Sequence, residues 1–277
     1  MTSRNSLTIF ITLVYLTFII FFSSIVFSKY IVFENKVDAE TVENDSQFTK
    51  HMDRRSKIVV RESHHDVSHF FSKSNSPYLY LTFDDGPTVY TKEILAILEQ
   101  YKIKSTFFML YGNIMRRPEE VTNALNNGHS IGCHGVTHKV KEFYKSAQSP
   151  KEEMNACSKA IEKYSGSMTK LARVPYGSYP NLTSIQKKQL ESAGYVIWDW
   201  NVDSTDWRLH SPEELVSQVL YQVKALQGKG IVPVILLHDT KITTKGLPKL
   251  IESLQELGYE FRKITPDVKP LQFNSTK

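Results

Sequence analysis

Two adjacent acidic residues stand directly after an apolar run and are followed by a Gly-Pro pair. The segment reads Asp84-Asp85-Gly86-Pro87, in which Gly86 permits unusual backbone angles and Pro87 restricts the exit. Carboxylates held side by side repel each other, and a bound cation relieves this repulsion by taking one of them as a ligand. The pattern indicates a metal-dependent site, although an ordinary Asp-Gly turn after a strand has the same sequence.

Two histidines four residues apart, His134 and His138, offer nitrogen ligands for such a site. At this spacing two imidazoles meet on one face of a helical turn. With one carboxylate they form an Asp-His-His set, which is typical of catalytic zinc with its three protein ligands and open position. A metal held in this way lowers the pKa of its water to about 7 and polarises a carbonyl oxygen. A structural or solvent-facing histidine pair is the alternative.

Other polar residues offer acid–base chemistry. His238 follows the apolar residues 234–237, where an imidazole could protonate a leaving group, and Asp84 could act as the base for water. Arg173, at the start of Arg173-Val174-Pro175-Tyr176-Gly177, could bind a carboxylate through two N–H groups or form a surface salt bridge. Trp207 could line a pocket or pack in the core.

Alternating short apolar runs and amphipathic segments must position these residues. Strands are expected over residues 78–83, 105–110, 130–133, 172–174, 195–200, 232–237 and 259–264. Helices are expected over residues 91–101, 118–127, 151–164, 183–193, 212–226 and 247–257. Repeated βα units of this kind predict an α/β fold with a parallel sheet, either doubly wound or rolled into a barrel.

The residues with chemically useful side chains follow the predicted strands. In parallel α/β folds the carboxyl ends of all strands face one side, where sites are built. We therefore expect one site to contain the following residues: Asp84 and Asp85, His134, Arg173, Asp203 to Asp206, His238 and Asp239.

The N-terminal part predicts export. Residues 7–27 form an uncharged apolar run between Arg4 and Lys29, long enough to cross a bilayer as a helix. We expect residues 1–28 to be an uncleaved transmembrane anchor, with a cleaved signal segment as the alternative. Residues 29–76 are polar and read as an extracytoplasmic stalk, whose His64, His65 and His69 we expect to be exposed rather than ligands.

Composition restricts the partners. The formal net charge is +5 and the pI about 8.9. This positive charge favours polyanionic surroundings such as a cell wall or an anionic membrane. The alternative is that a net charge of this size has no functional meaning. No basic run with interleaved aromatic residues occurs, so we expect no nucleic-acid partner, and no protein partner is evident. The two cysteines, Cys133 and Cys157, are expected to be buried and free rather than bridged.

Five motifs in order resemble those of polysaccharide deacetylases with the NodB homology domain, also called carbohydrate esterase family 4. They begin at Thr82, His134, Arg173, Asp203 and Leu236, and the resemblance covers residues 77–265, leaving residues 266–277 as a tail. The resemblance implies a distorted, incomplete (β/α) barrel. It also implies hydrolysis of acetyl groups on N-acetylated sugars of peptidoglycan, chitin or related polymers, or on O-acetylated xylan.

The same resemblance assigns roles residue by residue. Asp84 would be the general base and His238 the acid, with Arg173 orienting the base and Asp206 tuning the acid. Asp85, His134 and His138 would hold a divalent metal, usually zinc, with cobalt or nickel as alternatives. The backbone N–H of Tyr176 would stabilise the oxyanion, and the acetyl pocket would be lined by Pro175, Tyr176, Trp207 and Leu236.

Two positions depart from the family pattern. Gly135 stands where many members carry Ser or Thr, so that a supporting hydroxyl is absent and the metal is expected to be held less rigidly. Val174 replaces a more usual Pro. No catalytic group is missing, so activity is expected.

The sequence thus predicts a membrane-tethered, extracytoplasmic enzyme that removes N-acetyl groups from N-acetylglucosamine units of a cell-wall polysaccharide, peptidoglycan above all. Two alternatives use the same site: an O-acetyl esterase and a chitin-oligomer deacetylase. A third is an inactive wall-binding protein on the same scaffold.

Overall fold

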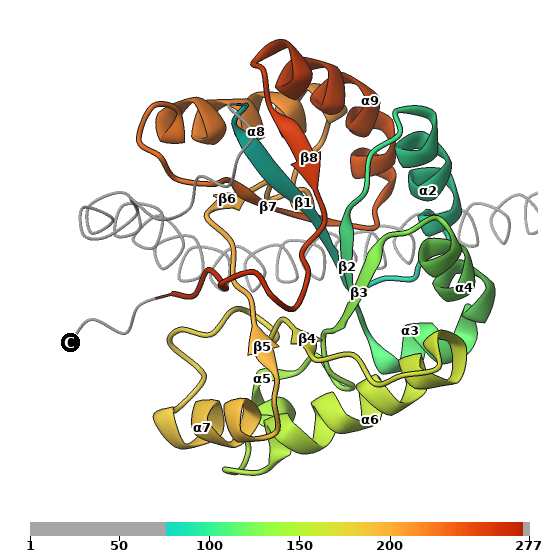
Figure 1. Cartoon of the computed structure of the whole chain (residues 1–277), viewed down its shortest axis with the longest axis vertical. Helices are drawn as coiled ribbons and strands as arrows, with labels where there is room; N and C mark the ends of the chain where they lie inside the picture. Colours follow the sequence, from blue (N-terminus) through green and yellow to red (C-terminus); the bar gives the residue numbers. More distant parts are fainter. Residues whose placement is uncertain (1–75, 274–277) are drawn as a thin grey trace, which may run out of the picture. The chain divides into compact units, whose positions relative to one another are not determined.

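The computed structural model describes residues 76–273 (Figure 1). The predicted anchor or signal segment of residues 1–28 lies outside these residues, as does the predicted stalk up to residue 75 with its three histidines. Between residues 76 and 273, no helix is both long enough and apolar enough to cross a membrane.

The described residues form an eight-stranded sheet in which every pair of neighbouring strands is parallel. Its path runs β5-β4-β3-β2-β1-β7-β6, and β8 pairs with the first residues of β1. The sheet curls into a half-barrel, and it is not closed, since its end strands β5 and β6 do not pair with each other. This confirms the predicted incomplete barrel. The strands are β1 (Tyr78–Asp84), β2 (Thr106–Met109), β3 (Ser130–Cys133), β4 (Leu171–Ala172), β5 (Val196–Ile197), β6 (Val202–Asp203), β7 (Val234–His238) and β8 (Glu260–Arg262).

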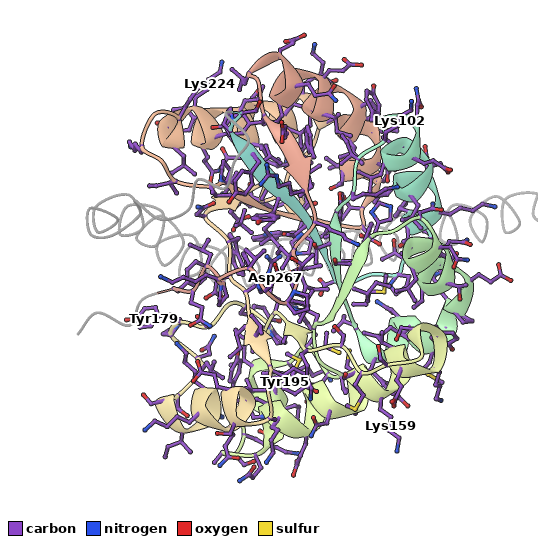
Figure 2. All side chains as sticks on the ribbon, viewed as in Figure 1. Lys102, Lys159, Tyr179, Tyr195, Lys224 and Asp267 are labelled. Carbon is purple, nitrogen blue, oxygen red and sulfur yellow. The ribbon has the colours of Figure 1, made fainter. Side chains whose placement is uncertain are left out.

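Helices surround the outside of the sheet (Figure 1). They are α2 (Thr91–Gln100), α3 (Tyr111–Arg116), α4 (Pro118–Asn126), α5 (Val140–Phe143), α6 (Ser149–Ser165), α7 (Ser184–Ser192), α8 (Pro212–Leu226) and α9 (Lys241–Glu256). Their charged side chains point away from the sheet, as Lys159 on α6 and Lys224 on α8 show (Figure 2). The apolar side of each helix therefore packs on the strands.

The structure differs from the prediction mainly in short elements. The helices α3 and α5 were not expected, and the predicted strand over residues 195–200 is reduced to β5. Helix α9 begins at Lys241 rather than near residue 247, because the Thr240 hydroxyl accepts a hydrogen bond from the Thr243 N–H and caps it. Gly246, read as part of a loop, lets α9 approach α8, since a Cβ there would lie 3.2 Å from the Pro212 carbonyl oxygen.

The central strand β1 is buried on both faces. Leu79, Leu81 and Phe83 belong to the apolar core under the helices. Thr82 and Asp84 alternate with them and face the inside of the half-barrel, as the two-residue period of a strand requires. The same strand therefore supports the core with one face and the site with the other.

We expect Phe107→Ala on β2 to lower the free energy of unfolding by about 3–5 kcal/mol, because it leaves a cavity in the core. Phe107 is fully buried and its ring stacks on Phe83 at a centroid distance of 4.9 Å. Urea denaturation of the purified protein measures the change. Tyr221→Ala is the control, since Tyr221 on α8 is 76% exposed. Equal losses in both variants would contradict this packing.

Candidate active site

The polar residues predicted to follow the strands meet at one end of the sheet. Asp84 ends β1 and His238 ends β7, and the two are opposite each other in the register of these strands. Arg173 follows β4, and its Nη1 lies 2.9 Å from the Oδ1 of Asp84. His134 follows β3, and its Nε2 lies 3.7 Å from the Oδ2 of Asp84. The strand ends therefore converge as the βα pattern predicts.

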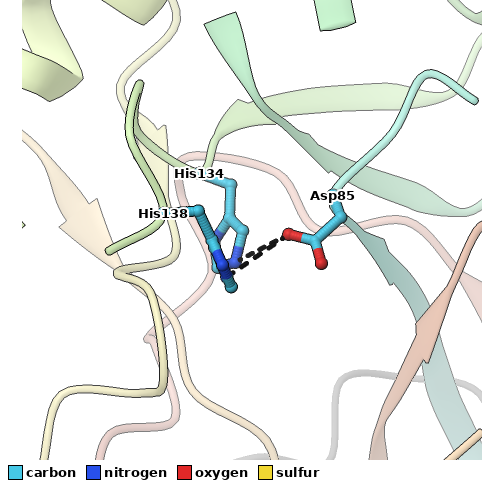
Figure 3. Close-up of side chains that lie close together, drawn as sticks. All are labelled: Asp85, His134 and His138. Carbon is cyan, nitrogen blue, oxygen red and sulfur yellow. Dashed lines mark ion pairs between the residues drawn. The ribbon is translucent and has the colours of Figure 1, made fainter. Parts of the chain in front are cut away.

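Three of these residues form a cluster that could hold a metal ion. The Asp85 carboxylate faces the rings of His134 and His138 (Figure 3), with its Oδ1 3.5 Å from the Nε2 of His134 and 3.4 Å from the Nε2 of His138. One potential ligand atom from each residue lies within 4.8 Å of the others. The Nδ1 of His134 is 2.6 Å from the Arg173 carbonyl oxygen, which leaves the Nε2 to face Asp85.

This set of donors fits a divalent cation. The Oδ1 of Asp85 is buried and has no hydrogen-bond partner among residues 76–273, a costly arrangement unless an ion or solvent completes it. Burial lowers the pKa of His134 to about 3, and the neighbouring Asp85 carboxylate opposes this shift only in part. The ring is therefore neutral at ordinary pH, which is the form that binds metals. Imidazole and carboxylate donors suit zinc and its neighbours.

The chain around these ligands has unusual backbone conformations. Asp85, His138 and Tyr176 have positive φ values of 70°, 49° and 63°. Such angles cost on the order of 1–3 kcal/mol each outside glycine and persist only where the surroundings enforce them. The segment between the two histidines is an irregular turn, so the helical turn expected from their spacing is wrong. The two rings nevertheless meet, with centroids 5.0 Å apart.

Arg173 is completely buried, so the alternative of a surface salt bridge is wrong. Its guanidinium donates to the Asp84 carboxylate, to the Thr82 hydroxyl and to two backbone carbonyls, those of Trp198 and Asp199. The expected carboxylate partner is thus that of Asp84, which Arg173 contacts through one nitrogen, Nη1. Burial raises the pKa of Asp84, and the positive charge of Arg173 acts in the opposite direction. Asp84 is thus a fixed carboxylate with an increased affinity for protons.

His238 and Asp206 form a second buried pair. The His238 Nδ1 lies 2.6 Å from the Asp206 Oδ1, and the His238 backbone N–H and the Thr243 hydroxyl both donate to the Asp206 Oδ2. Burial alone would lower the pKa of His238, but the charge and hydrogen bond of Asp206 outweigh it and raise that pKa to about 10. His238 is therefore protonated at neutral pH, as an acid must be.

The residues expected to line the acetyl pocket lie on the segments that carry these groups. The Tyr176 hydroxyl donates to the His138 carbonyl at 3.1 Å, and the centroids of their rings are 4.8 Å apart. Leu236 lies two residues before His238 on the same face of β7, and Pro175 is buried beside Tyr176. Trp207 is 44% exposed, so it does not belong to the core. Contact of these residues with a substrate stays a prediction.

Several supporting residues have no signal in the sequence. Asn113 on α3 donates to the Asp85 carbonyl at 2.5 Å. Asp199 accepts hydrogen bonds from the backbone N–H groups of Ser178 and Phe273, at 2.8 and 2.7 Å. Among the supporting residues, Asp239 is the one that the sequence places near the site, because it follows a predicted strand. It packs under Gly86, where a Cβ would clash with its carboxylate, and burial raises its pKa to about 7.

Comparisons with known proteins identify the family of this chain. The family model for polysaccharide deacetylase matches residues 72–198. The putative polysaccharide deacetylase YheN of Bacillus subtilis is 38% identical over 209 residues, or 74% of each chain. A peptidoglycan-N-acetylglucosamine deacetylase of Bacillus cereus is 34% identical, over 69% of this chain and 70% of its own.

A solved structure gives the same result for the fold. The polysaccharide deacetylase Bc1974 from Bacillus cereus superposes with a TM-score of 0.66 at 34% identity, covering 71% of this chain and 97% of that one. Fold and site together are those of a hydrolase that deacetylates polysaccharides. The chain belongs to the polysaccharide deacetylase family, as its five motifs predicted.

We expect Asp206→Asn to lower the pKa of His238 from about 10 to near or below the ordinary value of about 6.5, because the compensating charge is lost while burial remains. The native His238 ring loses its proton only as the pH rises through about 10, whereas the variant ring should lose its proton already near neutral pH. NMR titration of labelled histidine measures both values, with His238→Gln used to assign the signal. Glu213→Gln, an exposed carboxyl on α8, is the control. An unchanged pKa in Asp206→Asn would refute the pairing.

Proposed function

We propose that this protein is a metal-dependent deacetylase that removes the acetyl group from N-acetylglucosamine units of a cell-wall polysaccharide, and that its substrate is peptidoglycan. The observation that carries the proposal is the Asp85, His134 and His138 cluster, flanked by a fixed base at Asp84 and a protonated acid at His238. Similar proteins from Bacillus cereus and Listeria monocytogenes are peptidoglycan-N-acetylglucosamine deacetylases, which supports this substrate.

Hydrolysis of an acetamide needs an activated water, a stabilised carbonyl oxygen and a proton for the leaving nitrogen. A divalent ion such as zinc, bound by Asp85, His134 and His138, would act as a Lewis acid and make water more acidic. The residues of the chain supply the proton transfers. Asp84 accepts a proton from the attacking water, and Arg173 keeps its carboxylate pointed at the site.

His238 then protonates the departing amine. Its Nδ1 is engaged by Asp206, so its Nε2 is the nitrogen left to donate the proton. The products are acetate and a glucosamine unit. In this scheme the backbone N–H of Tyr176 stabilises the oxyanion, and Trp207 and Leu236 enclose the acetyl methyl group.

The decisive test is treatment of purified peptidoglycan with the protein, followed by mass measurement of the released muropeptides. We expect loss of acetyl groups from the glucosamine residues, abolition by a chelator and recovery with added zinc. Asp84→Asn is the matched control, because it removes the base and retains all three metal ligands. It should lose about 10²–10⁴-fold in kcat and still bind zinc.

Other outcomes of the same test separate the alternatives. Acetate release from acetylated xylan but not from peptidoglycan would identify an O-acetyl esterase instead. Deacetylation of chitin oligomers but not of peptidoglycan would identify a chitin-oligomer deacetylase. Normal turnover by Asp84→Asn would overturn the assignment of the base.

We also propose that residues 1–28 anchor the protein in the cell membrane with the catalytic domain outside. The support is the uncharged apolar run of residues 7–27. Immunoblotting of membrane and medium fractions should find the full-length chain with the membrane, and protease added to intact protoplasts should digest it. A shortened chain released into the medium would instead show that the segment is a cleaved signal.

A further inference from the structure

The loop between the two histidine ligands has an unusual backbone conformation. Gly135 has a φ of 95° and His138 a φ of 49°, so two of the five residues from His134 to His138 have a left-handed backbone conformation. A Cβ at position 135 would lie 3.0 Å from the Phe143 ring and 3.2 Å from a carboxylate oxygen of Glu153. The space beside Gly135 is thus occupied by groups from outside the loop.

Glu153 on α6 binds the middle of this loop through three hydrogen bonds. Its Oε2 accepts from the backbone N–H of Val136 at 2.8 Å and from that of Thr137 at 2.9 Å. Its Oε1 accepts from the Thr137 hydroxyl at 2.8 Å. Hydrogen bonds to a carboxylate are about twice as strong as those between neutral groups. One side chain therefore fixes both residues at the centre of the loop.

The helix that carries Glu153 is itself fixed to the sheet. Met154, Cys157 and Ile161 on α6 are buried in the core. The Cys157 thiol, one turn after Glu153, donates to the carbonyl of Met109 at the end of β2, 3.3 Å away. The carboxylate thus reaches the loop from a helix that is packed in the core and hydrogen-bonded to the end of β2.

The two histidines depend on this support unequally. His134 is oriented independently, by the Arg173 carbonyl at its Nδ1. The His138 ring packs against the rings of His134 and Tyr176, at centroid distances of 5.0 and 4.8 Å, and its backbone carbonyl accepts a hydrogen bond from the Tyr176 hydroxyl. Loss of Glu153 should therefore displace mainly His138 from its place 3.4 Å from Asp85.

We propose that Glu153 is a positioning residue for the metal site, which holds the His134–His138 loop in its ligating conformation. This rests on the proposed function, in that Asp85, His134 and His138 bind the metal. Groups of this kind around a metal site contribute about 10–100-fold to metal affinity.

The test is zinc binding by the full chain, purified in a mild detergent, stripped of metal and titrated against a chromophoric chelator. We expect the zinc Kd to rise at least about tenfold in Glu153→Ala. It should rise less in Thr137→Val, which removes one of the three hydrogen bonds and keeps both backbone bonds. Glu152→Ala, an exposed neighbour on the same helix, should bind zinc as the native chain does.

Activity at two zinc concentrations gives a second measurement. At limiting zinc, kcat of Glu153→Ala should fall with metal occupancy, and saturating zinc should restore most of it with KM unchanged. Circular dichroism establishes that each variant is folded. Glu153→Gln, which keeps the volume and one acceptor oxygen, replaces Glu153→Ala if the latter fails to fold, and it should also weaken zinc binding.

The outcomes are distinguishable. A native zinc Kd in folded Glu153→Ala or Glu153→Gln would overturn the role of Glu153 while the proposed function stands. Absence of zinc binding in the native chain and in Glu152→Ala alike would overturn the proposed function, and this inference with it.

Discussion

The buried guanidinium of Arg173 is the constraint on which the site depends. Its side chain joins the end of β1 to the segment after β5, through Asp84 and the carbonyls of Trp198 and Asp199. Its own backbone carbonyl meets the Nδ1 of His134. An unpaired charge in the interior would cost several kcal/mol, so the chain adopts an arrangement in which each nitrogen of the guanidinium makes a hydrogen bond. The proposed base, Asp84, and a candidate metal ligand, His134, are oriented by one residue as a result.

The two adjacent carboxylates have different surroundings because of one backbone angle. Consecutive residues of a strand point to opposite faces, and Asp84, as the last residue of β1, faces inward. Asp85 has already left the strand with a φ of 70°, which turns its carboxylate toward the two histidines. The Asp84 carboxylate is paired with the Arg173 guanidinium, and the Asp85 carboxylate faces the rings of His134 and His138. Neighbouring residues of the same type thus fit the two proposed roles, proton acceptor for Asp84 and metal ligand for Asp85.

Much of this site could be predicted from the sequence, because parallel strands have a common carboxyl end. Asp84, Arg173 and His238 all follow apolar runs, and the fold brings them together. The supporting residues could not be predicted, since Glu153 reaches the loop between the histidines, and Asp199 reaches Arg173, only through tertiary packing. The turn between the histidines was misread because a spacing of four fits a helix as well as this irregular loop. The Arg173 motif is compatible with a bound carboxylate and with a surface salt bridge, and the complete burial of Arg173 excludes the surface salt bridge.

The topology also determines when the site can form. Strand β1 lies at the start of the described domain, but two of its partners, β7 and β8, come from its last third. The segment after β5 is fixed through Asp199, which binds the backbone of Leu271 and Phe273 near the C-terminus. Contacts between residues so distant in sequence form late in folding, because a long loop must close first. In a nascent chain Asp84 and His238 therefore cannot meet until β7 has been synthesised, so the candidate site is assembled only when the domain is nearly complete.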